Sequence, residues 1–148
     1  MYNLQQIKLV YSLSKTILER PTLSHSKNVY DFLIEHAFDS ETIGLKESFK
    51  AVFVSINNKV LGIYPLAEGG CSHCPIDTKL IMSAAILSNA QGIILAHNHP
   101  SGNITPSSLD KAITEKIKQA SNLLDIRLLD HIIVTPFDYY SFSDNGII

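Results

Sequence analysis

The sequence predicts an α/β sandwich in which helices pack on a mixed β-sheet. Three observations predict this fold class. Several segments repeat apolar residues at helical spacing, β-rich runs lie between them, and one run, Gly92–Ala96 (GIILA), is apolar throughout. A short and continuously apolar run is typical of a strand that is buried on both faces of a sheet. Because such a strand needs cover on both faces, the pattern favours a sheet sandwiched by helices.

Composition and charge indicate an ordinary globular chain. It has 148 residues, of which 45% are hydrophobic and 18% are charged, and this suits a single hydrophobic core. The formal net charge is −2, so charge does not support nucleic acid as the main partner, because binding to phosphates usually requires a basic face. We find no signal-peptide pattern and no apolar run of the roughly 20 residues that a membrane helix needs. A cytoplasmic location without a membrane partner is therefore expected.

Two helices are predicted near the start of the chain. Residues 3–19 carry apolar side chains at near-helical spacing, and Glu19-Arg20-Pro21 should end that helix. A second helix is expected over Ser26–His36. We therefore interpret residues 1–40 as a short helical N-terminal extension and residues 41–148 as the main α/β domain.

A β-hairpin is predicted to open the main domain. Phe49–Ile56 is rich in β-forming residues, Asn57-Asn58 favours a turn, and Lys59–Pro65 supplies the partner strand. A loop opens at Glu68-Gly69-Gly70, and Asp77 can cap the helix that follows it.

Strands and helices are predicted to alternate over the rest of the chain. The buried strand Gly92–Ala96 is followed by a helix that begins near Thr105 or Ser107. The next strand is expected at Ile126–Val134, and a short last strand near Tyr139–Phe142. On the helix that begins near Thr105 or Ser107, the apolar residues that repeat on the predicted core face are Leu109, Ile113, Ile117, Ala120 and Leu124.

Two histidines follow the buried strand and are candidate metal ligands. His97 and His99 are separated by one residue, so in an extended segment both side chains point to the same side and can reach one ion. Neutral imidazole is the commonest metal ligand in proteins. The apolar strand before the pair fixes its position, and Pro100 and Gly102 turn the chain away after it.

Asp110, near the start of the next helix, can complete a His₂Asp ligand set. Three protein ligands with an open fourth position are typical of catalytic zinc sites, whereas structural zinc sites are closed by four ligands. Ser107 lies three residues earlier on the same helix face, where its hydroxyl could donate to developing negative charge. Simpler roles are also compatible with the pattern: a carboxylate favoured by the helix dipole for Asp110, and a helix cap for Ser107.

Hydrolysis at such a site also needs a general base. Zinc lowers the pKa of a bound water toward about 7, but a carboxylate must still take its proton and deliver it to the leaving amine. Spacing leaves two upstream candidates, Glu47 and Glu68, which flank the predicted hairpin.

These residues resemble the motif of the JAB/MPN zinc metalloproteases, also called the JAMM family. That motif consists of an upstream Glu, then HxH, seven residues, Ser, two residues and Asp. The chain matches it with His97-Asn98-His99, Ser107 and Asp110. Within the family, the segments HNHPSGN, PSSLD, LLDHIIVTP and YYSFSDNG are similar to the RadC-like branch, and the resemblance covers roughly residues 40–148.

The resemblance implies a fold, a cofactor and roles for individual residues. The implied fold is a JAB/MPN-like, cytidine-deaminase-like mixed sheet sandwiched by helices. The implied activity is cleavage of an amide or isopeptide bond in a protein or peptide by water activated on one Zn²⁺. The opening ESFKAVFVSINNKVLGI places the family's Glu at Glu47, which selects Glu47 over Glu68 as the general acid and base. Ser107 would support the oxyanion, and Ser72 would line the substrate site.

The sequence also departs from the RadC-like pattern. Full-length RadC proteins carry a helix-hairpin-helix segment before the JAB domain, and residues 1–40 are too short for it, which weakens a DNA role. Cys71 and Cys74 occupy the loop before Asp77, where a pair of small loop residues and a second metal site are alternative interpretations. His131 is expected to be a hydrogen-bonded core histidine, with support of the metal ligands as the alternative.

Other classes of function are weighed against the hydrolase. A zinc deaminase is disfavoured because its HxE and PCxxC signature does not match this chain. A non-catalytic MPN-like scaffold would be favoured by loss of a ligand or of the base, and the motif retains them all. A DNA repair or recombination accessory protein of RadC type is disfavoured by the acidic charge balance.

Overall fold

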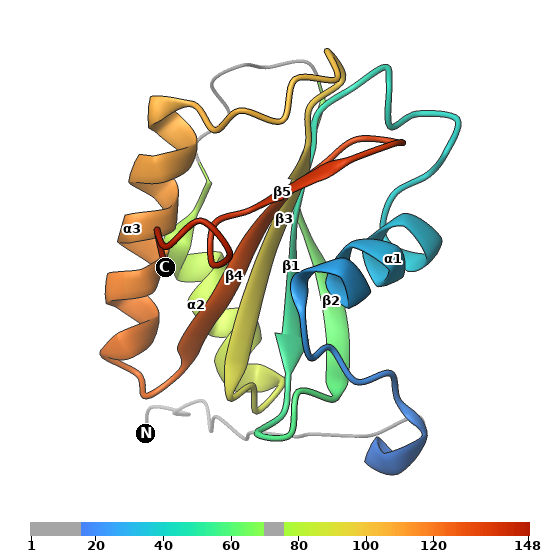
Figure 1. The fold of residues 1–148 in the computed structure, drawn as a ribbon. Helices are drawn as coiled ribbons and strands as arrows, with labels where there is room; N and C mark the ends of the chain where they lie inside the picture. Colours follow the sequence, from blue (N-terminus) through green and yellow to red (C-terminus); the bar gives the residue numbers. More distant parts are fainter. Residues whose placement is uncertain (1–15, 70–75) are drawn as a thin grey trace, which may run out of the picture.

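The computed structural model describes residues 16–69 and 76–148, and this part of the chain forms a five-stranded mixed sheet with helices on both faces (Figure 1). The strand order is β2-β1-β3-β4-β5. Strands β3 and β4 are parallel, and the other neighbouring pairs are antiparallel. The predicted α/β sandwich with a mixed sheet is therefore confirmed.

The helices divide between the two faces of the sheet (Figure 1). Helix α1 (Ser26–His36) packs on one face, and α2 (Thr78–Leu87) and α3 (Ser108–Asn122) pack on the other. The strands are β1 (Ser48–Val54), β2 (Val60–Glu68), β3 (Gly92–Asn98), β4 (Arg127–Val134) and β5 (Tyr139–Ser141). Among the described residues, no helix combines the length and the hydropathy that a membrane span requires.

The segment before β1 shares a core with the sheet. Helix α1 has the predicted bounds, and its Leu33 is buried in one cluster with Val52 of β1. A short 3-10 helix, η1 (Ile17–Glu19), precedes α1, while most of the helix predicted over residues 3–19 lies outside the described residues. The division of the chain at residue 40 stays a prediction.

Strand β3 lies at the centre of the sheet and is buried along its whole length, as the apolar GIILA run predicted. It continues two residues beyond that run, to His97 and Asn98. Because side chains alternate along a strand, Leu95 and His97 face the α2/α3 layer, whereas Ala96 and Asn98 face the α1 layer. Neighbouring residues of one strand therefore serve opposite faces of the sheet.

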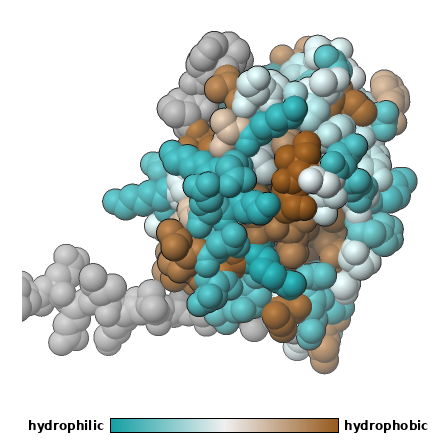
Figure 2. Space-filling model, turned by 60° about the vertical axis from the view of Figure 1, so that its left-hand side comes forward, coloured by the Kyte–Doolittle hydropathy of each residue, from teal (hydrophilic) through white to brown (hydrophobic). Residues whose placement is uncertain are grey.

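Helix α3 presents a more polar face to the sheet than its sequence predicted. Leu109 and Leu124 were expected in the core but are 61% and 43% exposed, so these two assignments are wrong. The residues that α3 buries are Asp110, Thr114, Ile117 and Ser121. Asp110 and Thr114 meet polar groups on the sheet, beside the core residue Ile117. Leu109 and Leu124, the second of which lies beyond the end of α3, remain exposed, and apolar side chains lie among hydrophilic ones on this side of the molecule (Figure 2).

Asn98 ties β3 to the segment that leads into β1. Its Nδ2 donates to the carbonyl oxygens of Ile43 at 2.7 Å and Lys46 at 2.8 Å. Its Oδ1 accepts from the Ser48 amide at 2.7 Å, and the residue is only 1% exposed. Because all three bonds go to the backbone around Glu47, Asn98 fixes the position of Glu47 relative to β3.

Replacing Asn98 with Ala should lower the free energy of unfolding by about 3 kcal/mol, because two buried backbone groups and one part-buried group lose their partner and each unsatisfied buried group costs roughly 1–3 kcal/mol. Equilibrium unfolding in urea measures this loss. The matched control is Asn122→Ala at an exposed position of α3, which should change stability by less than about 0.5 kcal/mol. An equal effect of the two substitutions would show that the Asn98 bonds contribute nothing.

Candidate metal centre

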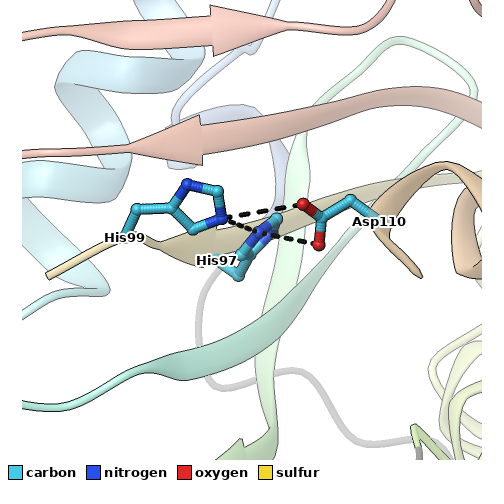
Figure 3. A group of neighbouring side chains, drawn as sticks. All are labelled: His97, His99 and Asp110. Carbon is cyan, nitrogen blue, oxygen red and sulfur yellow. Dashed lines mark hydrogen bonds and ion pairs between the residues drawn. The ribbon is translucent and has the colours of Figure 1, made fainter. Parts of the chain in front are cut away.

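Three side chains converge where β3 ends and α3 begins (Figure 3). His97 is on β3, His99 follows the strand directly, and Asp110 lies in the first turn of α3. Their ligand atoms all lie within 4.8 Å of one another, so the group could hold a metal ion. The structure therefore brings together the three residues that the sequence spacing selected.

The distances between these atoms suit one tetrahedral ion. His97 Nε2 lies 2.9 Å from His99 Nε2 and 3.2 Å from Asp110 Oδ1. His99 Nε2 lies 3.6 Å from Asp110 Oδ2. Tetrahedral coordination at about 2.0–2.1 Å separates neighbouring ligand atoms by roughly 3.3 Å, and the observed separations fall on both sides of that value.

The hydrogen bond behind His99 orients its ring toward the cluster. His99 Nδ1 lies 2.6 Å from the carbonyl oxygen of Asn103, and a carbonyl oxygen can only accept. Nδ1 therefore carries a proton, and in the neutral ring Nε2 presents a lone pair to His97 and Asp110. A neutral His99 therefore brings an acceptor to the other two ligand atoms.

His99 and Asp110 shift each other's pKa values in the direction that favours their charged forms. Hydrogen bonding with Asp110 raises the pKa of His99 against the effect of burial, and the charge of Glu47 adds to the rise. Burial acts to raise the pKa of Asp110, but hydrogen bonds with His97 and His99 outweigh it and hold that pKa well below its usual range. Asp110 is thus ionised at neutral pH, as a metal ligand must be.

Ser107 caps α3 and orients Asp110. Its Oγ accepts from the Asp110 amide at 3.1 Å, and the Asp110 Oδ2 accepts from the Ser107 amide at 2.7 Å, which completes a capping box. The capping role weighed from the sequence is therefore present. The box uses the Ser107 oxygen as an acceptor only, so its hydroxyl proton is left to donate elsewhere.

The two candidate bases have different surroundings. Glu47 is half-buried directly before β1, where its carbonyl accepts from the Gly69 amide at 3.1 Å, and its charge acts on His99. The Glu68 carboxylate lies 3.4 Å from Lys46 Nζ and 4.0 Å from Lys50 Nζ. Glu68 thus faces lysines, whereas the charge of Glu47 contributes to the raised pKa of His99.

The loop residues singled out from the sequence fall outside the described residues. Ser72, expected to line the substrate site, belongs to residues 70–75, as do Cys71 and Cys74. Their assignments stay predictions.

The sheet supports His97 from two sides. Its ring stacks on Phe49, the residue opposite it on β1, with centroids 5.1 Å apart and planes within 4°. Its Nδ1 lies 2.8 Å from His131 Nε2, so His131 is the hydrogen-bonded core histidine that was predicted. Burial lowers the pKa of His131 well below its ordinary value.

Sequence reasoning missed three residues that support the cluster, namely Phe49, Asn98 and Thr114. Two of them left a signal in the sequence. Asn98 follows His97 on a buried strand, so it had to be buried on the other face. Thr114 follows Asp110 by four residues and so shares its helix face. The contact of Phe49 depends on the pairing of β1 with β3.

Comparisons with known proteins show which family the chain resembles. A family model described as a RadC-like JAB domain matches residues 23–147. A UPF0758 protein of Flavobacterium johnsoniae is 45% identical over 101 residues, which cover 68% of this chain and 44% of that relative. The UPF0758 proteins YfjY and YeeS of Escherichia coli are 38% and 35% identical over 103 residues, covering 70% of this chain and 64% and 70% of those relatives.

The matched segments therefore span less than half the length of the Flavobacterium relative but more than half of the Escherichia coli ones. The names of these relatives designate a family and no reaction. The matched family model covers α1, the whole sheet and the cluster of His97, His99 and Asp110. The chain therefore belongs to the RadC-like JAB domain family.

Proposed function

We propose that this chain is a zinc-dependent hydrolase that cleaves an amide bond in a protein or peptide, as a metallopeptidase or isopeptidase. One observation carries the proposal: two imidazole nitrogens and one ionised carboxylate converge from β3 and α3 at separations that suit a single tetrahedral ion. Two histidines and a carboxylate are a ligand set that suits Zn²⁺. Three protein ligands leave a fourth position open, as in catalytic zinc sites.

Bound zinc would supply a water of lowered pKa and polarise the scissile carbonyl. His97, His99 and Asp110 are the residues that we assign to hold it. Asp110 suits this role because its carboxyl is ionised, and His99 suits it because its Nδ1 proton is held by the Asn103 carbonyl. Asp110 and His99 can therefore each present an electron pair to a metal ion.

Glu47 is the residue that we assign as general acid and base. A carboxylate in this role takes a proton from the attacking water and delivers it to the leaving amine. Two observations support the choice of Glu47: its charge acts on His99, and Asn98 fixes its backbone relative to β3. Glu68 is disfavoured because its carboxylate faces Lys46 and Lys50.

Ser107 is the residue that we assign to support the oxyanion. It is exposed at the N-terminus of α3, beside Asp110, and its hydroxyl proton is not used in the capping box. The helix dipole favours negative charge at this end, and a hydroxyl donor there would stabilise an oxygen on which charge develops. Ser72 completes the assignment as a residue lining the substrate site.

The metal assignment predicts one bound zinc ion per chain. The protein is purified without added metal, zinc is then supplied, and the zinc that remains bound is measured. Asp110→Ala should weaken zinc binding more than the roughly 10–100-fold that loss of a supporting partner causes, because it removes a ligand. Elemental analysis gives the ratio, and competition with a chromogenic chelator gives the affinity. Asp31→Ala, on the exposed side of α1, is the control and should bind like the wild type. A wild-type ratio well below one after zinc is supplied would contradict the assignment.

The base assignment predicts that Glu47→Gln binds zinc as tightly as the wild type and hydrolyses its substrate about 10²–10⁴-fold more slowly, the usual contribution of a positioned general base. The assay screens a library of peptides and isopeptide-linked peptides with the zinc-loaded protein. Glu68→Gln is the matched control and should keep its activity. Full activity of Glu47→Gln, or loss of activity only in Glu68→Gln, would show that Glu47 is not the base.

A further inference from the structure

A chain of hydrogen bonds leads from the candidate metal centre into the core behind His97. His97 Nδ1 lies 2.8 Å from His131 Nε2, and His131 Nδ1 lies 2.6 Å from Thr114 Oγ1. Thr114 Oγ1 also lies 2.6 Å from the carbonyl oxygen of Asp110. The chain therefore starts at one candidate ligand and returns to the backbone of another.

The fold places these groups opposite one another in pairs. On the sheet, β3 and β4 are in parallel register, with His131 beside Leu95 and therefore one alternation back from His97 on the same face. On α3, Thr114 lies one turn after Asp110. Asp110 thus meets His97, and Thr114 meets His131.

The hydrogen-bond partners set the direction of the protons in this chain. The carbonyl oxygen of Asp110 can only accept, so the single hydroxyl proton of Thr114 is donated to it. Toward His131 the Thr114 oxygen must then accept, which places the His131 proton on Nδ1 and leaves its Nε2 as an acceptor. His97 must therefore donate from Nδ1.

We propose that Thr114 and His131 are positioning residues that hold His97 in the tautomer with its proton on Nδ1, so that its unprotonated Nε2 faces the metal centre. The proposal rests on the proposed function, because it treats His97 as a zinc ligand. If the hydrogen bonds ran in the opposite direction, His97 would carry its proton on Nε2, and that atom could not bind a metal ion. The Thr114 hydroxyl selects between the two directions, although it lies away from the metal centre.

Because the chain of hydrogen bonds is buried, water cannot take over the role of the Thr114 hydroxyl. His97 and His131 are fully buried, and Thr114 is 1% exposed, so bulk water does not reach the chain to supply a missing donor or acceptor. The rings are held by aromatic stacking, His97 on Phe49 and His131 on Phe142, the second pair with centroids 4.6 Å apart and planes within 17°. The rings therefore keep the orientations that the hydrogen bonds require.

The tautomer of His131 can be read directly in the metal-free protein. Long-range ¹H–¹⁵N correlation spectra of the imidazole nitrogens distinguish a proton on Nδ1 from one on Nε2. We expect the wild type to carry the His131 proton on Nδ1. A proton on Nε2 would overturn the proposal, and this result needs neither bound zinc nor a variant that folds.

Zinc affinity tests the consequence for the metal centre. Thr114→Val keeps the shape of the side chain but removes the hydroxyl, and it should weaken zinc binding about 10–100-fold, as loss of a partner behind a ligand does. Thr114→Ser keeps the hydroxyl and should restore most of the affinity. Ser121→Ala is the matched control, because it removes another buried hydroxyl from the same helix face. Within the described part of the chain, that hydroxyl bonds to the Lys118 carbonyl alone.

The outcomes separate this proposal from the proposed function. If the wild type binds zinc and Thr114→Val binds it equally well, the positioning role is overturned while the metal site stands. If Ser121→Ala weakens binding as much as Thr114→Val, the effect comes from helix stability, and the positioning role is again overturned. A wild type that binds no zinc overturns the proposed function, and with it the positioning role toward a metal.

Discussion

The alternation of side chains along β3 is the constraint on which the candidate site depends. This central strand is buried on both faces, so each of its polar side chains needs a fixed partner on one side or the other. His97 turns toward α3 and meets Asp110, whereas Asn98 turns toward α1 and binds the backbone around Glu47. One strand thereby positions a candidate ligand and the candidate base.

The same constraint explains why the polar groups here form a connected set. Unpaired polar groups in a core cost more than paired ones, and a half-satisfied network is worse than an apolar core. Within the described residues, the buried side-chain atoms that lack a partner are Asn58 Oδ1 and Thr78 Oγ1, which lie outside this set. The ligand atoms of His97, His99 and Asp110 converge at one end of this set, where they could hold a metal ion.

Local patterns in the sequence predicted the parts of this structure that depend on near neighbours. The bounds of α1 and the burial of β3 follow from apolar spacing, and the approach of His97 to His99 follows from their separation by one residue. Contacts between distant segments were not visible in this way. Asn98 binds residues some 50 positions earlier, and α3 turns Asp110 and Thr114 toward polar partners on the sheet while Leu109 is exposed. Apolar periodicity marks a helix but does not register the polar contacts that orient it.

The roles proposed for Glu47 and Ser107 depend on His97, His99 and Asp110 binding one zinc ion together. Anomalous diffraction from a crystal grown with zinc, recorded on both sides of the zinc absorption edge, tests it most directly. If these residues share one zinc ion, we expect one strong anomalous peak about 2.0–2.2 Å from His97 Nε2, His99 Nε2 and a carboxylate oxygen of Asp110. A zinc peak held by other residues, with none between these three, would contradict it.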